Sequence, residues 1–276
     1  MAGGPLMCDF LEKAREIYRR PVKSIQAKKT EFDLVFNAIS ELQDVFSKSS
    51  LDIYNVEAVF GAIEMARFIN KFGDRTPADL QKLHDAFVTL LQITIQFSIP
   101  FQLDDINNPR APEPYHDFIG QLKSFQAGSV EERQSFSFIT LNYDVCLEVA
   151  LGNHGLKYDY CFDPLTESEA WPLLKLHGSI NWTEAKPAVY SDRFIEQFRN
   201  EIRHFGYYCP REGDPPLIVP PTWTKSNYDN RLPMVWSAAA RLLGEADNII
   251  VIGYSMPETV KFPPFFGQWL SKDWPT

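Results

Sequence analysis

The stretch FSFITLNYD at residues 136–144 is an apolar run that turns abruptly polar, and LLKLHGS at residues 173–179 repeats that character. A short, largely apolar run bounded by turn-forming residues is typical of a strand that is buried on both faces. Two further runs downstream have the same composition. We therefore predict four buried strands, at Phe136–Thr140, Leu173–Leu176, Leu217–Val219 and Asn248–Ile252.

Helical patterns lie between these runs. They cover Asp144–Leu151, Ser191–Phe205 and Arg231–Leu243, and glycines follow the last two at the position where helices commonly end. Strands that alternate with helices indicate a mostly parallel sheet covered on both faces. The predicted fold class is therefore α/β, a Rossmann-like doubly wound domain.

The first half of the chain is helical by its apolar spacing. A polar, proline-rich loop is predicted at 103–114, and a single domain of residues 1–276 would then carry residues 30–130 as a helical insertion. Thr76 before Pro77 is a predicted helix start. The expected helices are Pro5–Arg20, Glu31–Phe46, Val56–Asn70, one from Thr76 through Leu91, and Tyr115–Phe125.

Charge and composition narrow the class of partner. The net charge is −9 and the pI is near 5.1, whereas proteins that grip nucleic-acid backbones carry positive binding faces, so we expect no direct nucleic-acid partner. No apolar run reaches the roughly 18 residues that span a bilayer, and the start carries no secretory signal pattern. We expect a cytoplasmic protein with no membrane partner.

The residues that follow the predicted strands are the candidate site. Ligands in such sheets bind beyond the carboxyl ends of the strands, and there the sequence collects an amide, a carboxylate, an imidazole and a glycine turn. These side chains should lie at one rim. They are Asn142 and Asp144 after the first run, His177 after the second, and Gly253, Tyr254 and Ser255 after the fourth.

Each of these residues also has a purely structural interpretation. Asn142 and Asp144 can form a turn and cap the following helix. His177 can be a hydrogen-bonded core histidine, and Gly253 can belong to a tight turn with no ligand. Thr222 and Lys225, after the third run, are weaker candidates for phosphate contacts, and a solvated loop is the commoner role for such a lysine.

Three motifs resemble the sirtuin (silent information regulator type) family. Residues 140–144, TLNYD, resemble the sirtuin motif Thr-Gln-Asn-Ile-Asp, and residues 176–179, LHGS, resemble its His-Gly motif. Residues 251–257, VIGYSMP, are similar to the late strand-turn that holds the adenosine half of the cofactor. The motifs occur in the family's order and spacing, and the helical first half resembles bacterial sirtuin-like NAD hydrolases of anti-phage defence.

The resemblance implies that NAD is the substrate and that its nicotinamide–ribose bond is hydrolysed. It assigns the essential catalytic roles to His177 and Asn142, with Asp144 beside them. Nicotinamide leaves as a neutral group, so the site needs a base and a placed water rather than a general acid. The expected cofactor-binding residues are Ala2, Gly3, Thr140, Asn142, Asp144, His177, Gly253, Tyr254 and Ser255.

Two alternatives to hydrolysis stay open. Sirtuin deacylases carry a zinc module built from two cysteine pairs; the four cysteines here, Cys8, Cys146, Cys161 and Cys209, form no such pair, so we expect no metal. The second alternative is an inactive fragment that binds NAD or ADP-ribose. Ala2-Gly3-Gly4-Pro5 resembles only the end of the family's glycine-rich loop, and the last residues depart from the family pattern. Both features resemble a chain truncated at both ends. We also expect a homo-oligomer, although amphipathic helices more often pack on their own domain.

Overall fold

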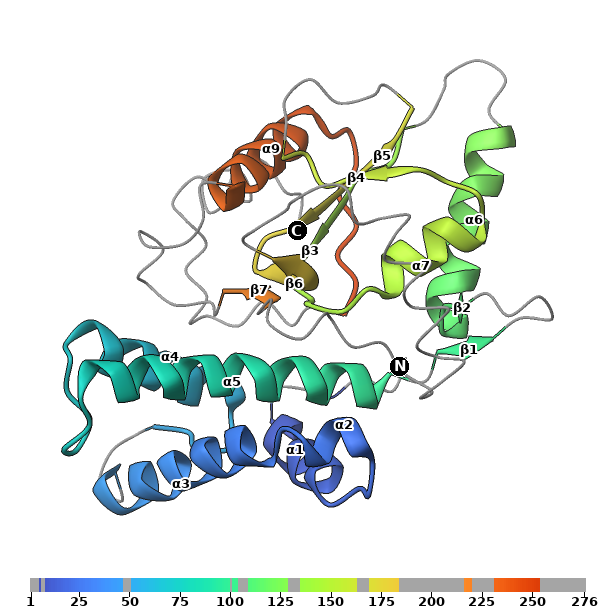
Figure 1. Ribbon diagram of the computed structural model, residues 1–276. Helices are drawn as coiled ribbons and strands as arrows, with labels where there is room; N and C mark the ends of the chain where they lie inside the picture. The colour runs from blue at the N-terminus through green and yellow to red at the C-terminus, as the bar shows by residue number, and fades with distance from the viewer. Residues whose placement is uncertain are drawn as a thin grey trace.

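The computed structural model describes residues 5, 8–46, 51–99, 101–103, 109–128, 135–162, 169–183, 216–219 and 231–253. Figure 1 shows a helical part made of the first five helices and, above it, a part that contains the sheet. One continuous hydrophobic core joins the buried side chains of both parts. None of the described helices is both long enough and apolar enough to cross a membrane.

The helical part follows the apolar spacing of the sequence closely. Its helices are α1 (Phe10–Tyr18), α2 (Lys23–Gln26), α3 (Lys29–Phe46), α4 (Val56–Phe68) and α5 (Pro77–Ser98). The prediction that the first helix starts at Pro5 is wrong, because Pro5 is not helical and Asp9 is the N-cap of α1. The short helix α2 was not expected, since four residues give too little periodicity to recognise.

Helix α5 is the longest element and lies between the other helices and the sheet-containing part (Figure 1). Its start is the predicted one: the Thr76 side chain accepts a hydrogen bond from the amide of Asp79, and the Asp79 carboxylate accepts one from the amide of Thr76. This capping box satisfies amides that the first turn leaves without partners. On its buried side, Phe87 stacks on Phe60 of α4 with 4.7 Å between the ring centroids.

The predicted loop at 103–114 contains more order than expected. Two short strands, β1 (Gln102–Leu103) and β2 (Pro109–Arg110), pair antiparallel, and α6 (Glu113–Gly128) begins two residues before the predicted Tyr115. The side chain of Asn153 anchors this segment, because it donates to Pro109 O at 2.8 Å and accepts from the amide of Ala111 at 2.9 Å.

The sheet confirms the predicted α/β class. Strands β3 (Phe138–Thr140), β4 (Tyr158–Asp159) and β5 (Trp171–Lys175) form a parallel sheet in the order β3-β5-β4. Helix α7 (Cys146–Asn153) lies between β3 and β4 in sequence, and α9 (Arg231–Glu245) packs on β5. Figure 1 shows α9 on one side of the sheet and α6 with α7 on the other, as in a Rossmann-like fold.

Two of the four strand predictions need correction. The run Leu217–Val219 does form a strand, β7 (Pro216–Ile218), but it pairs antiparallel with β6 (Gly178–Thr183), a strand that was not expected. Apolar composition alone does not fix a pairing direction. The run Asn248–Ile252 is not a strand; Ile250 is 79% exposed, and no described strand pairs with this run. The predicted helix Ser191–Phe205 lies outside the described residues.

Candidate functional site

The ends of β3 and β5 meet at one edge of the sheet. The two strands are parallel, with Thr140 opposite Lys175, and the amide of Leu176 donates to Thr140 O at 3.0 Å. The residues that follow the two strands therefore leave the sheet together. This pairing brings the loop that carries Asn142 next to the segment that carries His177.

The backbone of the loop after β3 is held by its neighbours. Tyr143 O accepts from the amide of Ile180 at 3.0 Å and from Ser179 Oγ at 3.2 Å, and both donors belong to β6. The Tyr143 hydroxyl donates to Val219 O at 3.2 Å. Thr140 Oγ1 accepts from the amide of Asn142 at 3.1 Å, so the Thr140 hydroxyl helps to shape the loop.

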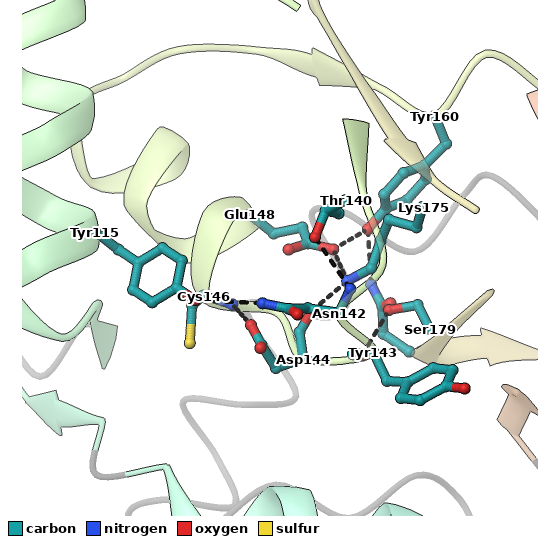
Figure 2. Close-up of polar contacts among 11 residues, drawn as sticks. Tyr115, Thr140, Asn142, Tyr143, Asp144, Cys146, Glu148, Tyr160, Lys175 and Ser179 are labelled. Atoms are coloured by element: carbon teal, nitrogen blue, oxygen red, sulfur yellow. Dashed lines mark hydrogen bonds and ion pairs between the residues drawn. The ribbon is translucent and has the colours of Figure 1, made fainter. Parts of the chain in front are cut away.

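Asn142 is exposed at the tip of this loop. Its side-chain Nδ2 lies 3.5 Å from the hydroxyl oxygen of Tyr115, which comes from α6, and Figure 2 shows the two side chains pointing toward each other. Because Asn142 directs its Nδ2 toward the Tyr115 hydroxyl, its Oδ1 points away from Tyr115. Burial raises the pKa of Tyr115 well above its usual range, with a further contribution from Asp144, so its hydroxyl stays neutral.

Asp144 takes the structural role that the sequence left open. Its Oδ1 accepts from the amide of Cys146 at 2.9 Å, and Cys146 is the first residue of α7 (Figure 2). Burial raises the pKa of the Cys146 thiol, and the Asp144 carboxylate adds to that shift. The half-buried carboxylate therefore forms a turn directly before α7, whose N-cap is Val145, and it lies two residues after Asn142.

His177 is a buried histidine with a defined ring orientation. Its Nδ1 lies 3.2 Å from Val219 O, and a carbonyl oxygen only accepts, so Nδ1 carries the hydrogen of this bond. In the neutral ring the basic nitrogen is then Nε2. The amide of Val219 in turn donates to His177 O at 2.9 Å. The rings of Tyr143 and Trp236 meet the imidazole edge-on, with centroid distances of 6.4 Å and 6.3 Å.

Gly178 permits the close approach that holds His177. Its φ of +80° is in the left-handed region, and a Cβ atom at this position would lie 2.1 Å from Leu217 O. Any other residue would push β7 away from β6. The glycine of the His-Gly pair is therefore required by strand packing next to His177.

Of the remaining predicted site residues, the structure describes Gly253. Gly253 has a φ of +67° and lies exposed; among the described residues, apart from its chain neighbours, no atom lies within 4 Å of the place where a Cβ would stand. Its backbone is thus open to close approach. Lying outside the described residues are Ala2, Gly3, Thr222, Lys225, Tyr254 and Ser255.

A buried polar network behind the loop was not predicted. Lys175 Nζ lies 2.8 Å from Glu148 Oε1 of α7 and also donates to Asp144 O. The Tyr160 hydroxyl donates to Glu148 Oε1 at 3.0 Å and accepts from the side chain of Asn181. Figure 2 shows Glu148, Tyr160 and Lys175 of this network close together beside the loop. A lysine inside an apolar strand pattern was the sequence signal that could have revealed it.

The described residues contain no group of three or more His, Cys, Asp or Glu side chains placed to hold a metal ion. The described residues bring together an exposed amide, a half-buried carboxylate and an imidazole with an oriented basic nitrogen, all at the carboxyl ends of two parallel strands. Ligands of Rossmann-like domains bind at this edge of the sheet, so these residues form the candidate site.

Comparison with known families agrees with this geometry. Residues 137–260 match the family model of the SIR2-like domain, and the matched stretch begins next to β3 and includes Asn142, Asp144, His177 and Gly253. This part of the chain is therefore similar to SIR2-like domains, which is consistent with the resemblance of its motifs to sirtuins. Such domains generally act on NAD, which relates the site to NAD chemistry. No curated protein that was compared matches the chain.

Proposed function

We propose that the site at the ends of β3 and β5 binds NAD and hydrolyses its nicotinamide–ribose bond to give nicotinamide and ADP-ribose. The observation that carries the proposal is the juxtaposition of His177 and the Asn142–Asp144 loop at one sheet edge. The SIR2-like match of residues 137–260 supplies the substrate class.

The residues present suit the ribose end of NAD. The exposed Asn142 amide offers both a donor and an acceptor for a ribose hydroxyl or for the attacking water. His177 Nε2 takes a proton from that hydroxyl or water, and Val219 O stabilises the protonated ring through Nδ1. The reacting ribose carries positive charge in the transition state, and the Asp144 carboxylate lies in the same loop as Asn142.

The adenosine half is assigned to the segment that begins at Gly253. Its open backbone and positive φ suit close approach of a phosphate or ribose. Tyr254 and Ser255 follow it in the sequence, and Ala2, Gly3 and Thr140 complete the set that the resemblance to sirtuins assigns to NAD. Of these, Thr140 also shapes the loop, because its hydroxyl oxygen accepts from the Asn142 amide.

The wider biological setting belongs to the same proposal. The resemblance of the helical first half supports a role in bacterial anti-phage defence, and the overall composition supports a cytoplasmic location. A homo-oligomer is part of the proposal only through the amphipathic helices of the first half, whose outer faces could form its contacts. A single domain of residues 1–276 with a helical insertion at 30–130 is supported by the common hydrophobic core, to which helices of both parts contribute.

The test is incubation of the full chain with NAD, with chromatographic measurement of nicotinamide and ADP-ribose. Turnover should be lost in His177→Ala. The matched control is His84→Ala on α5, since His84 is buried to the same degree, 9% exposed against 8% for His177, but lies in the helical part. Loss of folding stability should appear in both variants, and loss of turnover only in the first.

Other outcomes point to the other classes of protein. Nicotinamide released only in the presence of an acylated peptide would indicate a deacylase. NAD or ADP-ribose binding measured by calorimetry, without product, would indicate a binding module. Wild-type turnover in His177→Ala would refute the assignment of the base.

A further inference from the structure

The lysine at the end of β5 belongs to a pair of charged groups that are almost fully buried near the site. Lys175 is 1% exposed, and its partner Glu148 is also 1% exposed. Their atoms Nζ and Oε1 are 2.8 Å apart, within the length of a charge-assisted hydrogen bond. The neighbouring residues Leu174 and Leu176 are also buried, so Lys175 is a charged residue in an otherwise apolar stretch.

Stability alone does not account for this ion pair. Removing two charges from water costs several kcal/mol for each ion, and well-packed apolar residues in the place of such a pair often give equal or greater stability. Loss of one partner is strongly destabilising, because the other charge is then buried without compensation. The other contact of the ammonium group therefore indicates what Lys175 does.

The second contact of Lys175 is with the loop of the candidate site. Its Nζ donates to Asp144 O, while Ser179 Oγ and the amide of Ile180 donate to Tyr143 O. Two consecutive carbonyl groups are thus fixed from the β5–β6 side. Figure 2 shows the Lys175 side chain reaching toward the loop that carries Asn142 and Asp144.

We propose that Lys175 is a positioning residue for the site: it fixes the backbone at Asp144 and thereby orients the side chains of Asn142 and Asp144 toward the substrate. Glu148 holds the ammonium group in place through Oε1. This inference rests on the proposed function for the identity of the substrate, but not for the fixing of the loop. A lysine is suited to this role because one ammonium group can donate to a carboxylate and a carbonyl together.

The test uses a double variant, Lys175→Met with Glu148→Gln, which removes both charges. The glutamine Oε1 can still accept from the Tyr160 hydroxyl, so the rest of the network keeps its partner. The matched control is Tyr160→Phe, which removes a buried hydroxyl from the same network without touching the carbonyls of Tyr143 and Asp144.

We expect the double variant to unfold at a urea concentration close to that of the wild type, while its NAD turnover falls at least tenfold and its KM changes less than threefold. Hydrogen–deuterium exchange of the peptide that covers residues 141–146 should become at least tenfold faster. In Tyr160→Phe, turnover and exchange should both stay within twofold of the wild type, even where stability falls.

Wild-type turnover in the double variant overturns the proposal, whatever its exchange rate. Equal losses of turnover in Tyr160→Phe would also overturn it, because the effect would then be one of general stability. If the wild-type chain does not turn over NAD, the proposed function fails, and the exchange experiment decides alone: faster exchange at 141–146 supports the positioning role and unchanged exchange refutes it.

Discussion

Substitution of Gly178 by alanine tests how closely the strand beside His177 is packed. The added Cβ would stand 2.1 Å from Leu217 O, so β7 must move by more than about 1 Å to reach an ordinary contact distance. Overpacking of this kind costs about 1–3 kcal/mol. The φ of +80° adds about 1–2 kcal/mol for a residue that carries a Cβ. We expect Gly178→Ala to lower the free energy of unfolding by about 2–5 kcal/mol.

Gly155→Ala separates the two contributions. Gly155 has a similar φ of +68°, but no atom lies within 4 Å of its Cβ position. This variant should therefore lose only the backbone contribution, about 1–2 kcal/mol. Both are measured by urea unfolding followed by circular dichroism, with NAD turnover as a second readout, since β7 holds the His177 ring through Val219 O. Equal losses in the two variants would refute the close-packing argument.

Three further outcomes are expected. Thr76→Ala should lower the free energy of unfolding by about 1 kcal/mol, because the hydroxyl caps the first turn of α5; an unchanged urea midpoint would contradict this. Burial raises the pKa of Cys161 to about 11, so its alkylation, followed by peptide mass mapping, should accelerate about tenfold per pH unit between pH 8 and 10, and a pH-independent rate would be inconsistent with it. Tyr115→Phe should lower NAD turnover about fivefold, the equivalent of one ordinary hydrogen bond, and wild-type turnover would show that the hydroxyl does not orient Asn142.

The sequence predicts the part of the site that depends on short-range pattern. The apolar runs that become β3 and β5 end in polar residues, and parallel pairing alone then brings Asn142 near His177. The cap of α5 at Thr76 is predictable for the same reason, since a capping residue and its partner lie within one turn.

The strand predictions that were wrong depended on long-range pairing. β6 begins inside the motif that was expected to be a strand-end turn, and it pairs with β7, more than thirty residues further along the chain. Nothing in the composition of either segment predicts that the two strands pair with each other in an antiparallel direction. The run Asn248–Ile252 has the composition of a buried strand but is exposed, since no described strand pairs with it. Tyr115 was missed as a site residue because its contact with Asn142 depends on how α6 packs.

The buried pair of Lys175 and Glu148 also constrains how this site can evolve. Replacing either residue alone leaves a buried charge without a partner, at a cost of about 3–5 kcal/mol, which is comparable with much of the stability of an ordinary domain. Replacing both can be neutral for folding. The two positions are therefore expected to change together among related sequences: lineages that keep the lysine keep the glutamate, and lineages that lose one have lost the other, together with the constraint on the loop that carries Asn142.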